Sequence, residues 1–205
     1  MDLRKIQQNL MKPQPLFIGE QNAFRSAVVV PLVKKDDGWH ILFEVRSSKM
    51  RKQPGDISFP GGQIDDSDET VVAAAIRETY EELGVAVDDI HVIQQLPPLI
   101  MSSTFVVYPT VAIIPNQVNY TVSEDEVDEI FTIPLNWLLQ HEPYMHLVAM
   151  QPQPNEDFPY EKVANGRDYQ WRARSMEEWF YEYEGKTVWG LTARILKYFI
   201  DQVKE

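Results

Sequence analysis

Cysteine is absent from the sequence of 205 residues. Zinc sites with cysteine ligands, iron–sulfur clusters and thiol nucleophiles are therefore excluded, because each needs a cysteine sulfur. Histidine is scarce as well, and its four copies include no pair at the H-x3-H spacing, so we expect no zinc site. A chain of this length buries about 70% of its unfolded surface and needs no such cross-link to fold. We expect one domain over residues 1–205.

Basic residues are fewer than acidic ones, 19 against 31, which gives a net charge of −12 and a pI near 4.8. Proteins that grip DNA or RNA without regard to sequence need a basic face, so we expect no nucleic acid partner. The negative surplus is concentrated in residues 61–84, with a net charge of −6, and in residues 124–129, with −5. Residues 46–52 contain four bases in seven positions. This distribution favours a cation-binding site, with simple solubility as the alternative.

Long apolar runs that could form a membrane helix are absent. Residues 92–123 carry no formal charge over 32 positions, but four prolines interrupt them, and a membrane span needs about 20 predominantly apolar, helix-compatible residues. Residues 1–12 contain no apolar core and do not resemble a signal peptide. The chain ends on Val-Lys-Glu, which is not a peroxisomal signal. We therefore expect a cytoplasmic protein without a membrane partner.

Strand and helix signals are mixed along the chain in a way typical of an α/β or α+β domain. Apolar, β-branched runs flank a turn at Asp37-Gly38, which predicts a β-hairpin. The clearest predicted helix covers residues 69–83, because Gly84 supplies a C-terminal stop. The other expected elements are a helix over 2–12, hairpin strands over 26–33 and 39–45, a loop over 53–62, strands over 105–108, 110–114 and 184–188, helices over 134–139 and 191–203, and a long loop over 151–168.

The helix predicted over 69–83 carries an unusual set of charges. Glu78 and Glu82 lie four residues apart on one face, with Glu81 beside them. Like charges at this spacing destabilise an isolated helix, and anions are disfavoured near its C-terminus. Arg77 offsets only part of this repulsion. Three carboxylates behind a Gly-Gly loop are the hard oxygen donors that suit Mg²⁺ or Mn²⁺, whereas the alternative is a solvent-exposed acidic face.

Residues 61–85, GGQIDDSDETVVAAAIRETYEELGV, resemble the box of the Nudix hydrolase family, G-x5-E-x7-R-E-U-x-E-E-x-G-U with U aliphatic. The second half matches except that Thr79 replaces an aliphatic residue. In the first half Glu69 has the family spacing to the arginine, but six residues instead of five separate it from Gly62. Counted forward from Gly62, the acidic residue is Asp68. Both acids therefore remain candidates for the first glutamate of the box.

A second pattern, upstream of the box, resembles the coenzyme A diphosphatase branch of the same family. That branch has the signature L-L-T-x-R-S-x3-R-x3-G-x3-F-P-G-G, and its Asp-rich box loop is one residue longer. Residues 42–62 match every spacing of the signature. The mismatches are Phe43 and Glu44, which stand where the signature has Leu and Thr. Two adjoining patterns make a chance agreement very improbable.

The resemblance implies the Nudix fold, a mixed β-sheet sandwiched between helices, with a catalytic loop-helix-loop formed by the box. It covers residues 24–138 and 184–200, and residues 140–183 would form an insertion. Aromatic residues are frequent in this region, and we interpret them as packing, with a base-stacking wall or a dimer surface as alternatives. They are Trp171, Trp179, Phe180, Tyr181 and Tyr183.

The resemblance also implies roles for single residues. Arg77 would orient the carboxylates, and a loop without side chains at Gly61 and Gly62 would let the backbone approach metal and phosphate. The general base would be Glu81 or Glu126, between which the sequence does not choose. The implied metal ligands are Glu78, Glu81, Glu82 and Gly61. The implied catalytic residues are Arg77, Glu78, Glu81, Glu82 and Glu126, and the implied substrate-binding residues are Arg25, Arg46, Arg51, Gly61 and Gly62.

The activity implied by the resemblance is metal-dependent hydrolysis of the diphosphate of coenzyme A or its thioesters, which releases 3′,5′-ADP and (acyl-)4′-phosphopantetheine. The cofactor would be Mg²⁺ or Mn²⁺, the partner a small molecule, and the 3′-phosphate a target for arginine side chains. One alternative is a Nudix pyrophosphatase for ADP-ribose or NADH. Another is a non-catalytic Nudix module that senses a ligand. A homodimer is a further expectation.

Overall fold

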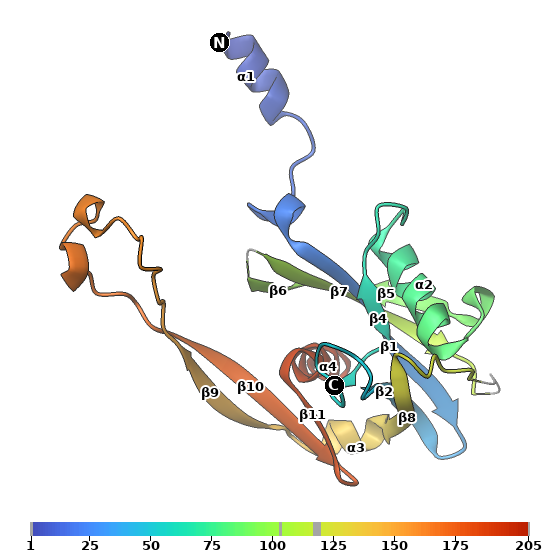
Figure 1. Ribbon diagram of the computed structural model, residues 1–205. Helices are drawn as coiled ribbons and strands as arrows, with labels where there is room; N and C mark the ends of the chain where they lie inside the picture. The colour runs from blue at the N-terminus through green and yellow to red at the C-terminus, as the bar shows by residue number, and fades with distance from the viewer. Residues whose placement is uncertain (1, 103, 117–119, 205) are drawn as a thin grey trace. The chain divides into compact units, whose positions relative to one another are not determined.

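The computed structural model describes residues 2–102, 104–116 and 120–204 (Figure 1). The chain divides into two compact units, residues 1–140 and residues 141–205. Each unit contains a sheet and at least one helix of its own. The single domain expected over residues 1–205 stays a prediction.

The first unit is built on a mixed β-sheet flanked by helices. Its described elements are α1 (Leu3–Leu10), β1 (Phe24–Lys35), β2 (Gly38–Arg46), β3 (Ile57–Ser58), β4 (Gly61–Gln63), α2 (Val71–Leu83), β5 (His91–Gln95), β6 (Leu99–Ser102), β7 (Phe105–Ile114), β8 (Val127–Pro134) and α3 (Leu135–Gln140). The sheet has the order β3-β2-β1-β7-β5, and β4, β6 and β8 pair in addition with β1, β7 and β2. Strands β1 and β7 are parallel, whereas the other pairs are antiparallel. The expected α/β class with a mixed sheet is confirmed.

The centre of this sheet is hydrophobic over long runs. Strands β1, β2 and β7 each contain at least five consecutive buried residues, as strands covered on both faces do. Helix α2 packs on β1, β4 and β7 (Figure 1). Its residues Ala74, Ala75 and Leu83 are completely buried in one cluster with Val29 and Ala112 of the sheet. Glu82 is buried as well and thus lies on the packed side of the helix, whereas Glu81 is exposed.

Both ends of α2 follow from the sequence around it. Thr70 precedes the helix, and its Oγ1 accepts a hydrogen bond from a backbone N–H of the first turn at 3.0 Å. Gly84 ends the helix with φ +67, a conformation that glycine adopts without strain. The helix predicted over 69–83 is thereby confirmed, although it begins two residues later. Thr79 fits its buried position because its Oγ1 donates to the carbonyl of Ala75 at 2.8 Å.

The predicted hairpin is formed by β1 and β2, with its turn one residue earlier than expected. The register Lys35↔Gly38 places Asp36 and Asp37 at the turn. Gly38 begins β2 with φ +137, so this glycine supplies the left-handed conformation at the strand end. The two short helices expected over 2–12 and 134–139 are present as α1 and α3.

Two sequence expectations in the first unit are corrected. The strands predicted over 105–108 and 110–114 are one strand, β7, which runs through Pro109. Although this proline has no N–H, its carbonyl accepts a hydrogen bond from Leu96 at 2.9 Å, so pairing continues across it. The loop predicted over 53–62 contains β3 and the start of β4, because its glycines pair with β1. Strands β5, β6 and β8 were not expected.

The second unit contains β9 (Tyr144–Met150), β10 (Arg174–Tyr183), β11 (Lys186–Trp189) and α4 (Gly190–Val203). Its strands form an antiparallel sheet in the order β11-β10-β9, and α4 packs on β10 and β11. The strand expected over 184–188 and the helix expected over 191–203 correspond to β11 and α4. The long loop expected over 151–168 lies between β9 and β10, where the chain forms two short 3₁₀ turns. In the part of the chain that the structure describes, no helix is long and apolar enough to span a membrane.

The aromatic residues of this unit make ring contacts in two groups, one on the sheet and one in the loop. Phe180 stacks on Tyr144 and on Trp189, with ring centroids 5.2 and 6.0 Å apart. Trp171 belongs to the loop and contacts Phe158 edge to face at 5.5 Å. Since neighbouring side chains alternate between the faces of a strand, Phe180 lies on one face of β10, and Trp179, Tyr181 and Tyr183 lie on the other.

Candidate active site

The two glycines of the box begin β4, and both stand where the backbone must come very close to other atoms. Gly61 pairs with Val28 and has φ +148, and a Cβ there would lie 2.3 Å from the carbonyl oxygen of Ala27. A Cβ on Gly62 would lie 2.3 Å from Oε2 of Glu78. Glycine at both positions therefore allows the helix carboxylate to approach the backbone of β4.

Glu82 is the buried member of the acidic face of α2. Its side chain is 5% exposed, and its Oε2 accepts a hydrogen bond from the backbone N–H of Gly61 at 2.7 Å. Burial raises the pKa of Glu82 well above its ordinary value, and the neighbouring charge of Glu44 raises it further. A carboxylate in such a place becomes ionised readily only when a cation lies beside it.

Arg77 holds the other carboxylates of the box through a fork of hydrogen bonds. Its Nε and Nη2 donate to Asp68 at 3.0 and 2.9 Å, and its Nη1 donates to Glu78 at 2.7 Å and to Glu81 at 3.1 Å. A further bond from Nη2 reaches the carbonyl of Gln63 at 3.0 Å. The pKa of Arg77 is raised by these partners, and the bond from Arg77 lowers the pKa of Asp68. The arginine thus fixes two glutamates relative to the loop before the helix.

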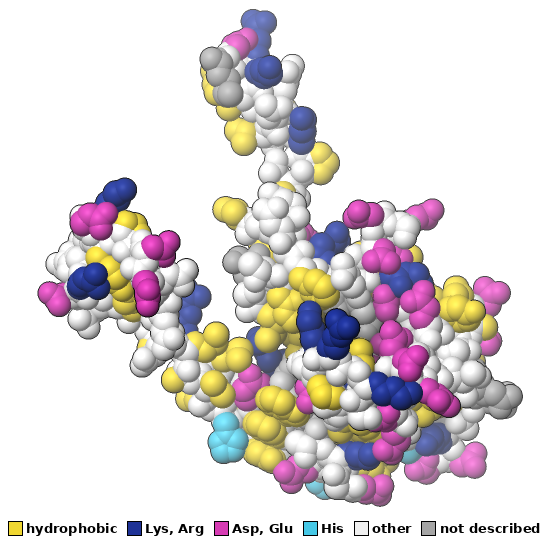
Figure 2. Space-filling model, in the orientation of Figure 1, with side chains coloured by type: hydrophobic (Ala, Val, Ile, Leu, Met, Phe, Trp, Pro, Cys, Tyr) yellow, Lys and Arg dark blue, Asp and Glu magenta, His cyan; other side chains and the backbone are white. Residues whose placement is uncertain are grey.

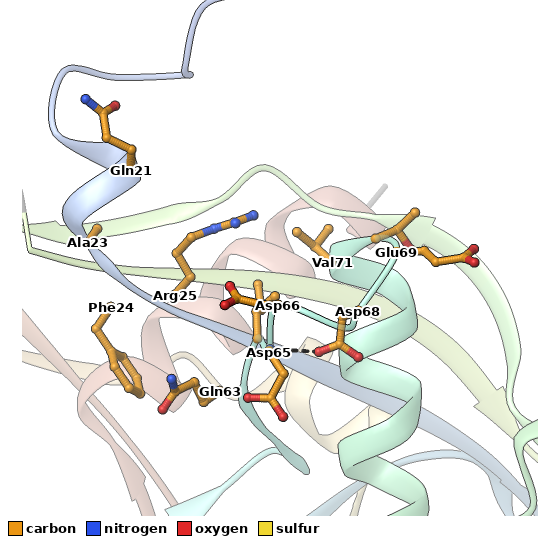
Figure 3. A pocket seen from close by; sticks show the side chains of 12 residues that line it. Gln21, Ala23, Phe24, Arg25, Gln63, Asp65, Asp66, Asp68, Glu69 and Val71 are labelled. Carbon is orange, nitrogen blue, oxygen red and sulfur yellow. Dashed lines mark hydrogen bonds between the residues drawn. The ribbon is translucent and has the colours of Figure 1, made fainter.

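The contacts of Arg77 distinguish the two candidates for the first acid of the box, Asp68 and Glu69. Asp68, the acid counted forward from Gly62, contacts Arg77 with both carboxylate oxygens. Glu69 lies on the surface at the edge of a pocket of about 460 Å³ between β1 and the loop before α2 (Figure 3). In the longer loop of this chain, the aspartate therefore takes the position beside the arginine.

Two further glutamates belong to the same region with different surroundings. Glu78 is half-buried, and burial raises its pKa while Arg77 opposes that rise. Glu126 lies on an exposed turn just before β8, and its charge raises the pKa of Glu44, Glu78 and Glu82. The structure thus brings Glu126 to the side of the molecule where the box carboxylates lie.

Glu44 is a residue of this site that the sequence interpretation missed. It lies within β2, is fully buried, and accepts a hydrogen bond from Ser58 Oγ at 2.9 Å on Oε1. Its Oε2 is buried and has no hydrogen-bond partner among the described residues. Burial raises the pKa of Glu44 to about 7. The available signal is an acid near the end of the apolar run WHILFEV, a run that predicts a buried strand.

The basic residues proposed for substrate binding lie in different places. Arg46, at the end of β2, is partly buried, and its Nε has no partner in the described part of the chain. Arg51 is exposed in the loop after β2. Arg25 lines the pocket of Figure 3, where its side chain extends toward the acidic loop and its guanidinium lies 5.4 Å from the ring centre of Tyr108. Arg25 therefore shares this pocket with Glu69, whereas Glu78 and Glu82 do not line it.

The acidic segment 124–129 has a structural use besides its nearness to the site. Asp128 accepts hydrogen bonds from Ser47 Oγ at 3.0 Å and from the N–H of Ser48 at 2.9 Å, which lower its pKa. Lys49 pairs with Asp125 at 3.1 Å. Segment 124–129 therefore holds the basic loop 46–52 in place, and Figure 2 shows acidic and basic side chains intermixed in the region of α2.

The residues present fit a divalent cation, as two observations of this site indicate. An oxygen of Glu44 is buried without a partner beside the second buried carboxylate, Glu82, and the missing Cβ of Gly62 leaves a cradle occupied by the carboxylate of Glu78. Hard carboxylate oxygens are the donors that Mg²⁺ and Mn²⁺ prefer. Among residues 2–102, 104–116 and 120–204, no three acidic or histidine side chains already converge as a finished metal site. Binding would therefore involve adjustment of side chains.

The chain is similar to known proteins both in sequence and in structure. Residues 23–152 match the family described as NUDIX domain. The chain is 34% identical over 176 residues to an "Uncharacterized Nudix hydrolase NudL" of Enterobacter sp. (strain 638), which covers 86% of this chain and 81% of that protein. It is 35% identical over 189 residues to the protein of the same name in Citrobacter koseri, covering 92% and 86%. A crystal structure of a Nudix hydrolase from M. Smegmatis, RenU, is similar with a TM-score of 0.47 and 16% identity over 57% of this chain and 74% of that chain.

Proposed function

The chain belongs to the Nudix hydrolase family, and from this premise we propose that it hydrolyses the diphosphate of coenzyme A or an acyl-coenzyme A. The products would be 3′,5′-ADP and (acyl-)4′-phosphopantetheine. Nudix enzymes act on small molecules that contain a nucleoside diphosphate, and they generally use divalent metal ions. The identity of the metal, Mg²⁺ or Mn²⁺, and the choice of coenzyme A are parts of the proposal.

One observation carries the choice of substrate, namely the match of residues 42–62 to the coenzyme A diphosphatase signature. The backbone of Arg46 donates to the carbonyl of Asp56 and accepts from the N–H of Gly55, both at 2.9 Å. These bonds close the basic loop and join it to the strand that leads into the box. They support the view that signature and box work as one site, with a basic side for phosphate and an acidic side for metal.

Within the proposed reaction, carboxylates of the chain would hold the metal, and arginine side chains would bind the phosphates. Arg77 orients Glu78 and Glu81, which with Glu82 and the backbone of Gly61 would hold the metal. When bound, Mg²⁺ or Mn²⁺ would neutralise the diphosphate and lower the pKa of an attacking water. Arg46 and Arg51 would bind phosphate oxygens through charge-assisted hydrogen bonds.

The general base stays open between Glu81 and Glu126. Arg77 donates a hydrogen bond to Glu81 at 3.1 Å, which fixes this carboxylate next to the arginine. Glu126 is on an exposed turn near the other glutamates. Replacing each glutamate by glutamine and measuring kcat as a function of pH separates the two. Only the variant that lacks the general base should lose the increase of kcat on the acidic side of the pH profile.

The proposal is tested by incubating the purified protein with coenzyme A, acetyl-coenzyme A, ADP-ribose and NADH, with Mg²⁺ or Mn²⁺, and separating the products by chromatography. We expect 3′,5′-ADP from coenzyme A and its thioester. Consumption of ADP-ribose or NADH while coenzyme A stays intact would replace the proposed substrate by another nucleoside diphosphate. No turnover of any substrate with either metal would favour the ligand-sensing module, against which the intact Arg77 and box glutamates argue.

Two features of the proposal rest on the sequence and not on the site. We expect the protein to act in the cytoplasm, which fractionation of cells that produce it would test. We also expect it to form a homodimer, which the mass of the protein in solution would test.

A further inference from the structure

Glu44 is the most unusual ionisable residue of the first unit. Its side chain is 0% exposed, although it lies in a strand whose neighbouring residues are apolar. One oxygen accepts a hydrogen bond from Ser58, and the other, Oε2, is buried without a partner within the described residues. A carboxylate placed in this way is destabilising unless something absent from the folded chain compensates it.

The surroundings of Glu44 make its burial as a charged group still less favourable. The nearby Glu82 is also buried, and its side chain accepts a hydrogen bond from the N–H of Gly61. The charges of Glu44 and Glu126 both disfavour ionisation of Glu82. Arg46 is the base that acts on Glu44, but its own Nε is buried and unpartnered, and no ion pair joins the two in the described part of the chain. Among residues 2–102, 104–116 and 120–204, no ion pair neutralises either of the two buried carboxylates.

We propose that Glu44 is an additional ligand of the divalent metal, which it would bind through its unpartnered Oε2 together with the box carboxylate Glu82. A cation beside both groups would supply the missing partner and remove their mutual repulsion. This inference rests on the metal-dependent part of the proposed function. It assigns a metal-binding role to a residue of β2 outside the box. At this position the coenzyme A diphosphatase signature has threonine.

The competing explanation is that Glu44 is held neutral and only supports Ser58 and the loop around it. If Glu44 is neutral, glutamine reproduces its shape and its lack of charge, and Mn²⁺ binding should not change in Glu44→Gln. A ligand would lose its charge in the same substitution, and metal binding would weaken. Glu44→Gln therefore separates the two roles, because glutamine has nearly the same size and can still accept the hydrogen bond from Ser58.

The experiment measures Mn²⁺ binding to the substrate-free protein from the electron paramagnetic resonance signal of free Mn²⁺. We expect Glu44→Gln to weaken Mn²⁺ binding at least about tenfold, since even residues that only support ligands typically contribute that much. Glu178→Gln is the matched control, because Glu178 is also a buried strand glutamate with an unpartnered oxygen, but belongs to the second unit. It should bind Mn²⁺ as the wild type does.

Thermal unfolding provides a second measurement that does not depend on activity. At pH 8 the metal-free Glu44→Gln protein should have a higher Tm than the metal-free wild type, and Mn²⁺ should raise its Tm by less. If Glu44→Gln does not fold, Glu44→Asp, which keeps the charge but shortens its reach, should show the same weakened Mn²⁺ binding.

The outcomes distinguish this inference from the proposed function. If the wild type binds no Mn²⁺, the metal-dependent function itself fails. If the wild type binds Mn²⁺ and the Glu44 variants bind it equally well, only the assignment of Glu44 is overturned. Weakened binding in Glu44→Gln or Glu44→Asp, with unchanged binding in Glu178→Gln, supports Glu44 as a ligand.

Discussion

At the scale of single residues, the site combines groups whose environments push their protonation in opposite directions. Asp68, in contact with Arg77, has a lowered pKa, whereas burial raises the pKa of Glu82 and Glu44. The hydrogen bonds from Arg77 lower the pKa of Asp68, and no ion pair joins the buried pair to a base in the described chain. A divalent cation is the group that would bring both sets to full ionisation.

The first prediction concerns Glu82. Glu82→Gln should retain the fold, because the amide oxygen can still accept the hydrogen bond from Gly61, and kcat for coenzyme A should fall roughly 100-fold or more. The fold is checked by circular dichroism and the rate by product chromatography. Turnover equal to that of the wild type would remove Glu82 from the set of metal ligands.

The second prediction concerns pH and the metal-free protein. Unfolded Glu44 loses its proton near the ordinary pKa of 4.5, whereas the buried group keeps it up to about pH 7. Between these values the unfolded chain binds fewer protons than the folded one, so the free energy of unfolding should decrease as pH rises, by up to about 3 kcal/mol. Above pH 7 this contribution becomes constant.

Urea denaturation in the presence of EDTA at pH 5 and pH 8 measures this decrease. Because Glu82 also has a raised pKa and contributes a decrease of its own, the comparison is with Glu44→Gln, in which the decrease should be smaller by the share of Glu44. An equal decrease in both proteins would show that Glu44 does not carry the pH dependence.

The third prediction concerns Arg51 and the 3′-phosphate of coenzyme A. Arg51→Ala should raise KM several-fold for coenzyme A but hardly for dephospho-coenzyme A, because only the former offers the third phosphate to the guanidinium. Steady-state kinetics with both substrates measures the difference. Lys52→Ala, a charge change at the neighbouring exposed position, is the control. Equal increases in KM for both substrates in Arg51→Ala would contradict recognition of the 3′-phosphate.

At the scale of elements, the site depends on the contact between β4 and α2. Strand β4 is short, yet it pairs with the central strand β1 and carries both glycines of the box. Helix α2 is capped by Thr70 and packs its small residues, Ala74 and Ala75, against the sheet. The result is that a carboxylate of the helix lies directly against backbone, without intervening side chains.

The fourth prediction tests this contact. Gly62→Ala places a methyl group 2.3 Å from Oε2 of Glu78, so the carboxylate must move, and kcat should fall at least about tenfold. The backbone of Gly62 does not need a positive φ, so the effect is one of space and not of backbone strain. Gln63→Ala, at the exposed next position, serves as control and should keep most of its activity. Unchanged kcat in Gly62→Ala would contradict the required close approach.

At the scale of the whole molecule, the second unit extends beyond the family match. The match to the NUDIX domain ends at residue 152, after β9, whereas β10, β11 and α4 lie outside it. Strand β9 is an edge strand, all seven of its residues are exposed, and its sequence YMHLVAM contains no charged residue and no proline. Edge strands commonly carry charged residues or proline, because these prevent pairing with another chain.

The fifth prediction follows from this edge. We expect two copies to associate by antiparallel pairing of β9, which would satisfy its free backbone groups. Size-exclusion chromatography with light scattering should give the mass of a dimer for the wild type and of a monomer for Leu147→Lys, in which a charge enters the strand. Leu10→Lys, on exposed α1, should remain dimeric. A monomeric wild type at every concentration would refute the expected homodimer.

Much of the fold and site could be predicted because the deciding signals are local in sequence. The spacing of Arg77, Glu78 and Glu82 follows from helix periodicity, and Gly84 marks the end of the helix. The hairpin follows from the two apolar, β-branched runs that flank Asp37-Gly38, within one residue of its turn. Strand β8 was missed because its acidic start obscured the pattern, and its pairing with β2 joins segments far apart in the chain.

The sequence by itself determined the family and the α/β class, because the box is a set of residue types at fixed spacings on one loop and one helix. Tertiary structure decided which acid meets Arg77, namely Asp68, and which acids are buried. Glu44 and Glu82 lie on different elements, and their proximity exists only after β2, β4 and α2 have packed together. Burial and repulsion between distant carboxylates are properties of that packing, so no local pattern could have predicted them.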